Sequence, residues 1–189
     1  MDMFEYVMVL VSIIVGLALA HLLQGLVEIA QRPKRMKIAS IHLVWVIYVL
    51  TTVAFWWWWE FKLQLVPVWT FGAYLFVLGY AVILYILSTL LFPKVLDSDL
   101  DLDAFFYDSR GWFFGFNALY FVVDLIDSRL KGAEYFANLG LEYVITTALS
   151  GVLCLVAMKT RNPVFHWIFG LAVLLYQTSW AFRQFGTMG

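Results

Sequence analysis

Acidic side chains that lie inside apolar stretches are the residues of this sequence best suited to chemistry. Glu60 ends one such stretch, Asp124 lies late in another, and Glu142 lies early in a third. A charged group surrounded by lipid is costly, so it usually pairs with another group or marks a path for ions or substrates. Asp127 precedes Lys131 by four residues and is expected to form a helical ion pair with it. Asp124 has no basic residue at that spacing, and we predict that it either is neutral or holds a cation.

Aromatic and polar side chains accompany these acids at a similar depth. Trp56 and Trp57 belong to a run of four tryptophans and precede Glu60 by four and three residues, so on a helix both lie on its side. An aromatic wall beside a carboxylate can bind an organic cation, and a tryptophan run can also anchor a helix at the membrane surface. The candidate binding residues are Glu60, Asp124, Glu142, Gln177, Trp56 and Trp57.

A second polar group gathers toward the opposite membrane surface. It comprises all three histidines, with a glutamine and a glutamate on the helical face of the first histidine: His21, Gln24, Glu28, His42 and His166. Histidines can ligate haem or relay protons. They can also lie at the interface with each ring bonded to backbone or water. The second interpretation is favoured because no two histidines have a ligand spacing on one helix, so no cofactor is predicted and haem is the minor alternative.

Five aspartates stand close together between two of the apolar stretches. Counted from the first, they occupy positions 1, 3, 5, 7 and 12 of a calcium-binding loop: Asp97, Asp99, Asp101, Asp103 and Asp108. Such a loop requires glycine at position 6, where this sequence has Leu102. A solvated acidic connector therefore fits better than a divalent-cation site, which is kept as a weak alternative.

Membrane-spanning helices must position these residues. The 189-residue chain is 63% hydrophobic and 13% charged, with a mean hydropathy of +0.86, and a water-soluble domain could not cover so much apolar surface. Stretches near the spanning length of about 20 residues lie at about 6–29, 39–59, 69–92, 111–128, 139–158 and 164–183. The short connectors favour antiparallel neighbours, so we expect an all-α bundle of six helices that forms a single transmembrane domain over 1–189.

The distribution of basic residues predicts how this bundle is oriented. The first, third and fifth connectors carry Arg32, Lys34, Arg35, Lys37, Lys94, Arg110, Lys159 and Arg161, whereas the opposite side carries Lys62, Arg129, Lys131 and Arg183. The positive-inside rule places the richer side in the cytoplasm and both termini outside. We therefore expect a multi-pass protein of a plasma membrane, such as the bacterial inner membrane. The net charge of −1 gives no reason to expect a nucleic-acid partner.

One stripe of small residues predicts how the first helix packs. Ser12, Gly16 and Ala20 recur every four residues, a spacing that lets two membrane helices approach closely. The partner helix can belong to the same chain or to another one. We expect a homo-oligomer or a membrane partner protein, besides the surrounding lipid.

The sequence favours transport over catalysis. It contains no nucleotide-binding loop, hydrolase elbow or zinc-protease motif, so an enzyme is not expected. The leading hypothesis is a small channel or transporter for a cation, proton or small organic solute, with an acidic outer mouth formed by Glu60, Asp124 and Glu142. The alternative is a membrane sensor, lipid-binding protein or complex-assembly protein that transports nothing. A haem-binding redox protein is more remote.

Overall fold

The protein is a bundle of long helices. The computed structural model describes residues 3–31, 40–93 and 101–185, and no β-strand occurs within these ranges. The described residues form α1 (Met3–Gln31), α2 (Ser40–Trp59), the 3-10 helix η1 (Glu60–Leu65), α3 (Phe71–Thr89), α4 (Leu102–Leu130), α5 (Ala133–Ala157) and α6 (Pro163–Phe185). Each predicted span overlaps one α-helix, and the all-helical fold is confirmed.

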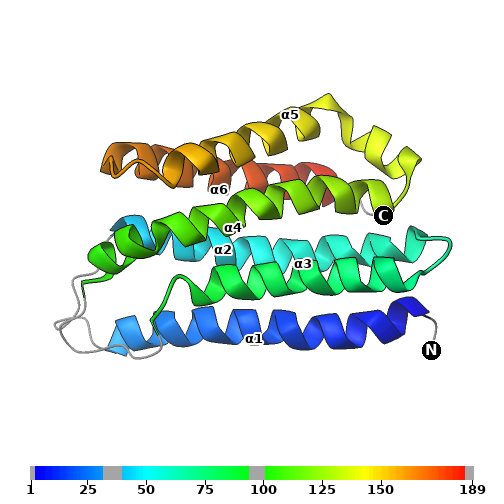
Figure 1. Ribbon diagram of the computed structural model, residues 1–189, viewed down its shortest axis with the longest axis horizontal. Coiled ribbons are helices and arrows are strands. Elements are labelled where there is room, and N and C mark those ends of the chain that lie inside the picture. Colours follow the sequence, from blue (N-terminus) through cyan, green and yellow to red (C-terminus); the bar gives the residue numbers. More distant parts are fainter. Residues whose placement is uncertain (1–2, 32–39, 94–100, 186–189) are drawn as a thin grey trace.

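The α-helices run along one long axis in alternating directions (Figure 1). The start of α1, η1 and the turn between α4 and α5 lie together at one end, which we call the Glu60 end. The starts of α2 and α6 lie at the opposite end, which we call the His42 end. The last residues of α6 return to the Glu60 end, so the start of α1 and the end of α6 both lie there.

Five helical segments are long and apolar enough to cross a membrane. They are α1, α2 together with η1 (Ile41–Leu65), α3, α5 and α6 (Pro163–Gln184). The fold is therefore that of a membrane protein. The fourth predicted span, 111–128, lies within α4, which is 29 residues long but is not one of the five. Asp124 and Asp127 lower the hydropathy of its apolar stretch.

Polar side chains define where several helices begin. Thr70 accepts a hydrogen bond from the Ala73 backbone N–H at 3.1 Å and caps α3. The carboxylate of Asp101 accepts the backbone N–H groups of Asp103 and Ala104 and caps α4. Each cap satisfies amide groups that have no partner within the first turn of the helix.

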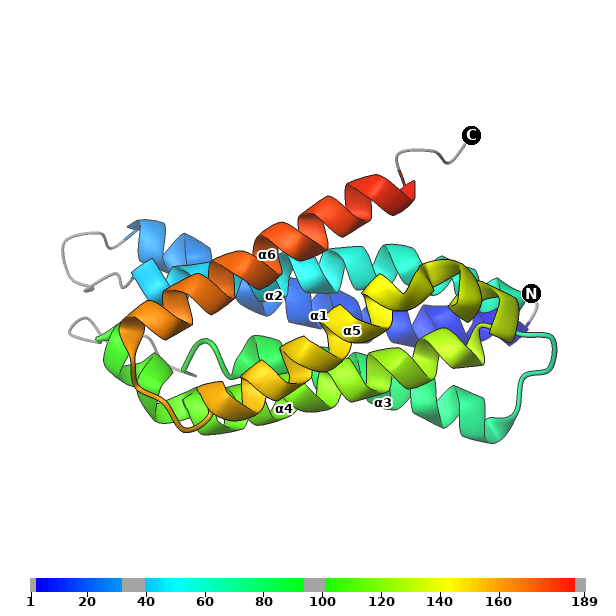
Figure 2. The same cartoon turned by 90° about the horizontal axis from the view of Figure 1, so that it is seen from above.

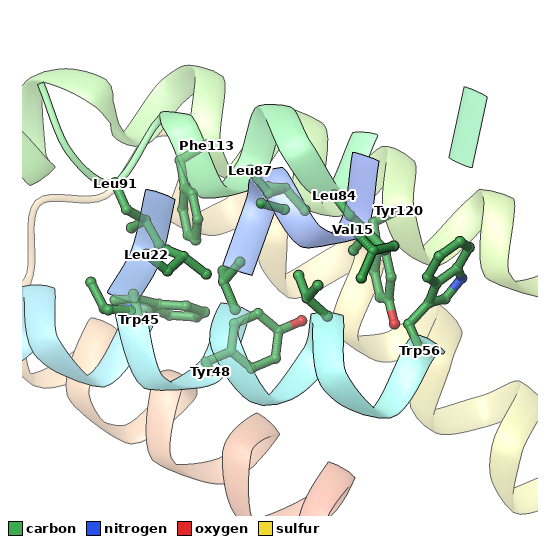
Figure 3. Close-up of a cluster of buried hydrophobic side chains, with 14 of the residues drawn as sticks. Val15, Leu22, Trp45, Tyr48, Trp56, Leu84, Leu87, Leu91, Phe113 and Tyr120 are labelled. Atoms are coloured by element: carbon green, nitrogen blue, oxygen red, sulfur yellow. The ribbon is translucent and has the colours of Figure 1, made fainter. Parts of the chain in front are cut away.

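Helix α2 contributes much of the central core and contacts α1, α3, α4 and α6. Figure 3 shows Trp45 and Tyr48 of α2 facing Leu22 of α1 and Phe113 of α4. The Trp45 ring meets the rings of Phe113, Phe114 and Phe169 edge-on, with centroids 4.8–5.6 Å apart. Edge-to-face contacts of this kind stabilise aromatic cores beyond the area that they bury.

The tryptophan run at the end of α2 divides between core and surface. Trp56 is 1% exposed and packs against Tyr80, whereas Trp57 and Trp58 are 37% and 57% exposed. Successive helical residues turn by about 100°, so four neighbours cannot share one face. Of the two tryptophans expected on the side of Glu60, Trp56 packs inside the bundle and Trp57 does not. The α-helix gives way to η1 at Glu60, immediately after the run.

The close contact of α1 is made by a different glycine from the one that the spacing indicated. A Cβ atom at Gly25 would lie 2.5 Å from the Phe92 ring, so only glycine fits here without a shift. A Cβ atom at Gly16 would meet nothing within 4 Å. The stripe of Ser12, Gly16 and Ala20 therefore makes no close helix contact through Gly16 within the part of the chain described here.

Candidate functional site

A cavity of about 280 Å³ lies toward the Glu60 end, between α2, η1, α4, α5 and α6. Figure 2 shows the C-terminal half of α6 leaning away from the other helices at this end. The charged and aromatic side chains that line the cavity include Tyr48, Trp56, Trp59, Glu60, Lys62, Tyr120, Asp124, Lys131, Tyr135, Tyr143, Tyr176 and Trp180. Ligand pockets usually measure about 300–1,000 Å³, so this cavity suits a small solute.

A buried lysine joins two carboxylates at the edge of the cavity. The Lys131 Nζ lies 2.8 Å from Glu60 Oε1 and 2.5 Å from Asp127 Oδ2. Glu60 opens η1, while Asp127 and Lys131 lie one turn apart at the end of α4, so the contact ties the two regions together. The ion pair expected between Asp127 and Lys131 is confirmed. Burial lowers the pKa of Lys131, but the two carboxylates raise it by more, and the net pKa lies above its ordinary value.

Each of the two carboxylates keeps one oxygen without a protein partner. Glu60 is 0% exposed and Asp127 is 1% exposed. Glu60 Oε2 and Asp127 Oδ1 accept no hydrogen bond from any described residue. A buried acceptor without a donor costs about 1–3 kcal/mol, so each such atom calls for an explanation. Glu60 is one of the residues that line the cavity, so a small movement of its side chain would bring this oxygen to a bound solute.

Two tyrosine hydroxyls hold the carboxylate of Asp124. The Tyr80 hydroxyl donates to Oδ1 at 2.8 Å and the Tyr143 hydroxyl donates to Oδ2 at 2.6 Å. The Ser128 hydroxyl lies 2.7 Å from that of Tyr143 and extends the network. Asp124 is on α4, whereas Tyr80 is on α3 and Tyr143 on α5, so three helices fix its position. Hydroxyl donors stabilise the charged form of a carboxylate.

Gln177 lines the same cavity, but its side chain also joins two helices. Its Nε2 donates to Thr51 Oγ1 at 2.5 Å and to the Tyr48 carbonyl at 3.2 Å. Its Oε1 accepts from Thr52 Oγ1 at 2.8 Å. These bonds tie α6 to the middle of α2, as interhelical polar contacts commonly do in membrane proteins.

The structure thus brings most of the candidate binding residues to one cavity. Glu60, Asp124, Gln177 and Trp56 all line it. Glu142 does not, because it is about half exposed and forms a bidentate ion pair with Arg183 at 2.6 and 3.0 Å. Trp57 lies on the outer side of α2, away from the cavity lining.

Sequence reasoning missed several residues that line the cavity or hold its acids in place. Tyr80 and Tyr143 hold Asp124, and Lys131 binds Glu60 as well as Asp127. The two tyrosines could have been found from the sequence, since a phenol inside an apolar span needs a hydrogen-bond partner. The contact between Glu60 and Lys131 could not have been found in this way, because the two residues lie 71 positions apart in the sequence.

The histidines at the His42 end divide between two packing sites, one around Phe92 and one against α4. His42 Nε2 donates to the Leu91 carbonyl at 2.6 Å, and the rings of His42 and His21 both meet the Phe92 ring edge-on. His166 Nε2 donates to the Thr160 carbonyl at 3.0 Å. Because a carbonyl can only accept, these two rings carry their proton on Nε2.

Gln24 and Glu28, which belong to the same polar group as the histidines, pair with each other. Gln24 Nε2 donates to Glu28 Oε1 at 3.2 Å, on the outward side of α1. His166 packs instead against α4, where it stacks on Phe114 with centroids 5.3 Å apart. The five residues therefore do not converge on one point.

The aspartates of the proposed calcium loop are mostly accounted for by α4. Asp97 and Asp99 lie outside the described residues. Asp101 caps the helix, and Asp103 and Asp108 lie on it, with Asp108 3.7 Å from Arg161. A loop that turned helical at its sixth position could not wrap an ion in the usual way. Within residues 3–31, 40–93 and 101–185, no three His, Cys, Asp or Glu side chains are placed to share a metal.

Comparison with known proteins identifies no relative. No family model, curated protein sequence or solved structure matches the chain. The function has to be inferred from the cavity itself.

Proposed function

We propose that this protein is a small multi-pass membrane transporter that binds a small cation in the cavity at the Glu60 end. One observation carries the proposal. Glu60 and Asp124 line the cavity and Asp127 lies beside it, whereas the lysines there are the buried Lys131 and the half-buried Lys62. The three carboxylates therefore exceed the two lysines by one.

Buried carboxylates that outnumber their cations either take up protons or bind a further cation, and a bound cation keeps them ionised. Two opposite unit charges 4 Å apart attract by about 4 kcal/mol at the effective dielectric constant of about 20 that suits proteins. The aromatic lining adds ring faces that attract cations, with Trp56 and Tyr120 both buried beside Glu60 and Asp124. A small cation would balance the charge, and an anion would be repelled.

A transporter is favoured over a channel by the packing below the cavity. Toward the His42 end, Trp45, Phe113, Phe114 and Phe169 form an interlocked aromatic layer, and each ring is at most 4% exposed. A solute could pass this layer only if helices moved. Movement that opens one side at a time is the usual mechanism of secondary transporters.

The proposal includes a topology of six spans with both termini outside. The length of α4 and its course alongside the other helices support its role as a span (Figure 1). The basic connectors at the His42 end would then face the cytoplasm, and the membrane would be the plasma membrane, in bacteria the inner one. A C-terminal alkaline phosphatase fusion should be active in bacteria. A fluorescent C-terminal green fluorescent protein fusion would contradict the orientation.

The outward stripe of α1 supports assembly with a second membrane helix. Gly16 has open space around it, which a helix from another copy or from a partner protein could fill. Cross-linking of a Gly16→Cys variant in membranes would detect a homo-oligomer as a disulfide-linked dimer, and the wild type with its buried Cys154 is the control.

Flux measurements in proteoliposomes test the transport proposal. We expect wild-type protein to carry at least one of labelled methylammonium, Na⁺, K⁺ or protons. Asp124→Asn and Glu60→Gln should each reduce the flux at least about tenfold, the effect expected from losing one charge contact. Glu142→Gln is the matched control and should retain flux. Absence of wild-type flux for every cation would refute transport.

The second candidate is a sensor that binds the same solute without moving it. The aromatic layer of Trp45, Phe113, Phe114 and Phe169 favours it, because this layer separates the cavity from the His42 end. Saturable binding without flux, together with a partner protein that co-purifies in fixed ratio, would support the sensor.

A further inference from the structure

We infer that the solute bound in this cavity is a protonated amine that still carries N–H bonds, attached to a small apolar body, and that its ammonium donates to Glu60 Oε2. The inference rests on the proposed binding function and narrows the class of solute. It does not require that the solute be transported.

Glu60 and Asp124 are the two carboxylates that line the cavity, and they differ in how many of their oxygens lack a hydrogen-bond donor. Glu60 Oε1 is taken by Lys131, and the Asp124 oxygens are taken by Tyr80 and Tyr143. Glu60 Oε2 remains, on a side chain that is fully buried and lines the cavity. One charged acceptor without a donor matches one N–H of an ammonium group, whose bond to a carboxylate is charge-assisted.

The small number of carboxylate oxygens without donors disfavours two other kinds of cation, divalent metal ions and quaternary ammonium ions. A calcium ion binds about six to eight oxygen ligands and a magnesium ion demands a near-octahedral set. On Glu60 and Asp124, the two carboxylates that line the cavity, the oxygens other than Glu60 Oε2 already serve Lys131, Tyr80 and Tyr143. A quaternary ammonium could lie against the rings, but it has no N–H group and would leave Glu60 Oε2 without a donor.

The lining residues other than the carboxylates indicate the chemistry of the part of the solute that is attached to the ammonium group. Trp56 and Tyr120 present buried ring surface to the cavity, and Val173 lies on the α6 side. Two polar groups of the α5 and α6 walls are already engaged, since Gln177 bonds to α2 and Thr146 donates to Tyr176 at 2.7 Å. A volume of about 280 Å³ admits a compact body. A small arylalkylamine or alkylamine satisfies all of these conditions.

A pair of ligands that differ only in their N–H groups provides the test. Benzylammonium and benzyltrimethylammonium should be titrated into the full-length protein in detergent at neutral pH, with binding followed by calorimetry. We expect benzylammonium to bind at least about tenfold more tightly, because one charge-assisted hydrogen bond contributes about that much. Equal or tighter binding of the quaternary compound, or no binding of benzylammonium, would overturn the inference.

A variant pair tests the assigned atom. Glu60→Gln keeps the size of the side chain and should weaken benzylammonium binding at least about tenfold, while binding of the quaternary compound changes less. Glu142→Gln, outside the cavity, should leave both affinities unchanged. Unchanged benzylammonium affinity in Glu60→Gln would overturn the role of Oε2. The comparison of two ligands on wild-type protein stands even if the variant does not fold.

The outcomes also separate this inference from the transport proposal. Tight amine binding without flux in proteoliposomes would leave the amine assignment standing and refute transport. Flux of Na⁺ or of a quaternary ammonium, with no binding of benzylammonium, would support transport and overturn the amine assignment.

Discussion

The ammonium of Lys131 lies 2.8 Å from the carboxylate of Glu60, and both side chains are at most 3% exposed. Asp127 shares the same ammonium from one turn earlier on α4. Two carboxylates and one lysine thus form a buried cluster that joins the end of α2 to the end of α4. Because buried charges depend on their partners, this cluster is where single substitutions should have their largest effect on stability.

Replacing the lysine should destabilise the protein strongly. Lys131→Met leaves the Glu60 and Asp127 carboxylates buried without their cation, which should lower the free energy of unfolding by about 3–5 kcal/mol. Unfolding in mixed detergent and SDS micelles measures the change. Lys159→Met, at an exposed position, is the control and should change it by less than about 1 kcal/mol. A Lys131→Met variant as stable as wild type would show that the cluster contributes nothing to folding.

The contribution of Lys131 to stability should not be lost between neutral and moderately alkaline pH. Its pKa is raised in the folded protein above the ordinary value of 10.5, because the two carboxylates outweigh burial. A group with a raised pKa contributes its full stability below the unfolded pKa and loses it as the pH rises through the folded pKa. The stability difference between wild type and Lys131→Met should therefore be at least as large at about pH 9 as at about pH 7. Thermal unfolding at the two values checks this, and a smaller difference at the higher pH would contradict it.

Removing one hydroxyl from the Asp124 network should have an intermediate effect. Tyr143→Phe deletes the donor to Asp124 Oδ2 and the partner of Ser128, and should cost about 1–3 kcal/mol of stability. Tyr85→Phe, on the outer side of α3, is the control and should be nearly neutral. The same unfolding assay applies. If both variants unfold alike, the hydroxyl of Tyr143 does not hold Asp124.

Two glycines of α1 should respond oppositely to a methyl group. Gly25→Ala places Cβ 2.5 Å from the Phe92 ring, which His42 and His21 contact from other sides, and overpacking of this kind costs about 1–3 kcal/mol. Gly16→Ala meets open space and should be neutral or slightly stabilising, because alanine favours a helix over glycine by about 1 kcal/mol. Comparable destabilisation by both would contradict the assigned packing of α1.

The sequence predicted the helices better than their ends. The predicted span 39–59 and α2 (Ser40–Trp59) nearly coincide, since apolar length alone defines both. The predicted span 111–128 is much shorter than α4 (Leu102–Leu130). Hydropathy detects the part of a helix that suits lipid, whereas Asp101 caps a helix that continues beyond that part through polar residues.

The sequence predicted some of the residues that line the cavity, and the contacts that it did not predict share one cause. Glu60, Asp124 and Trp56 could be selected because a charge or an indole at that depth is informative from one helix alone. The pairing of Glu142 with Arg183 instead of the cavity depends on how α5 meets α6. Its neighbour Tyr143 faces Asp124 because of how α5 meets α4. Contacts between helices far apart in the sequence have no local signal.

The separation of Glu60 from Lys131 has a consequence for biosynthesis. The chain is made from its N-terminus, so the ribosome must add 71 more residues after Glu60 before the lysine exists. At the usual about 5–20 residues per second, that takes several seconds. During this interval the first helical hairpin holds an acid whose folded partner has not yet been made. Glu60 lies at the change from α2 to η1, near the end of the spanning segment Ile41–Leu65, and its carboxylate meets its cation only when the α4–α5 turn has been made.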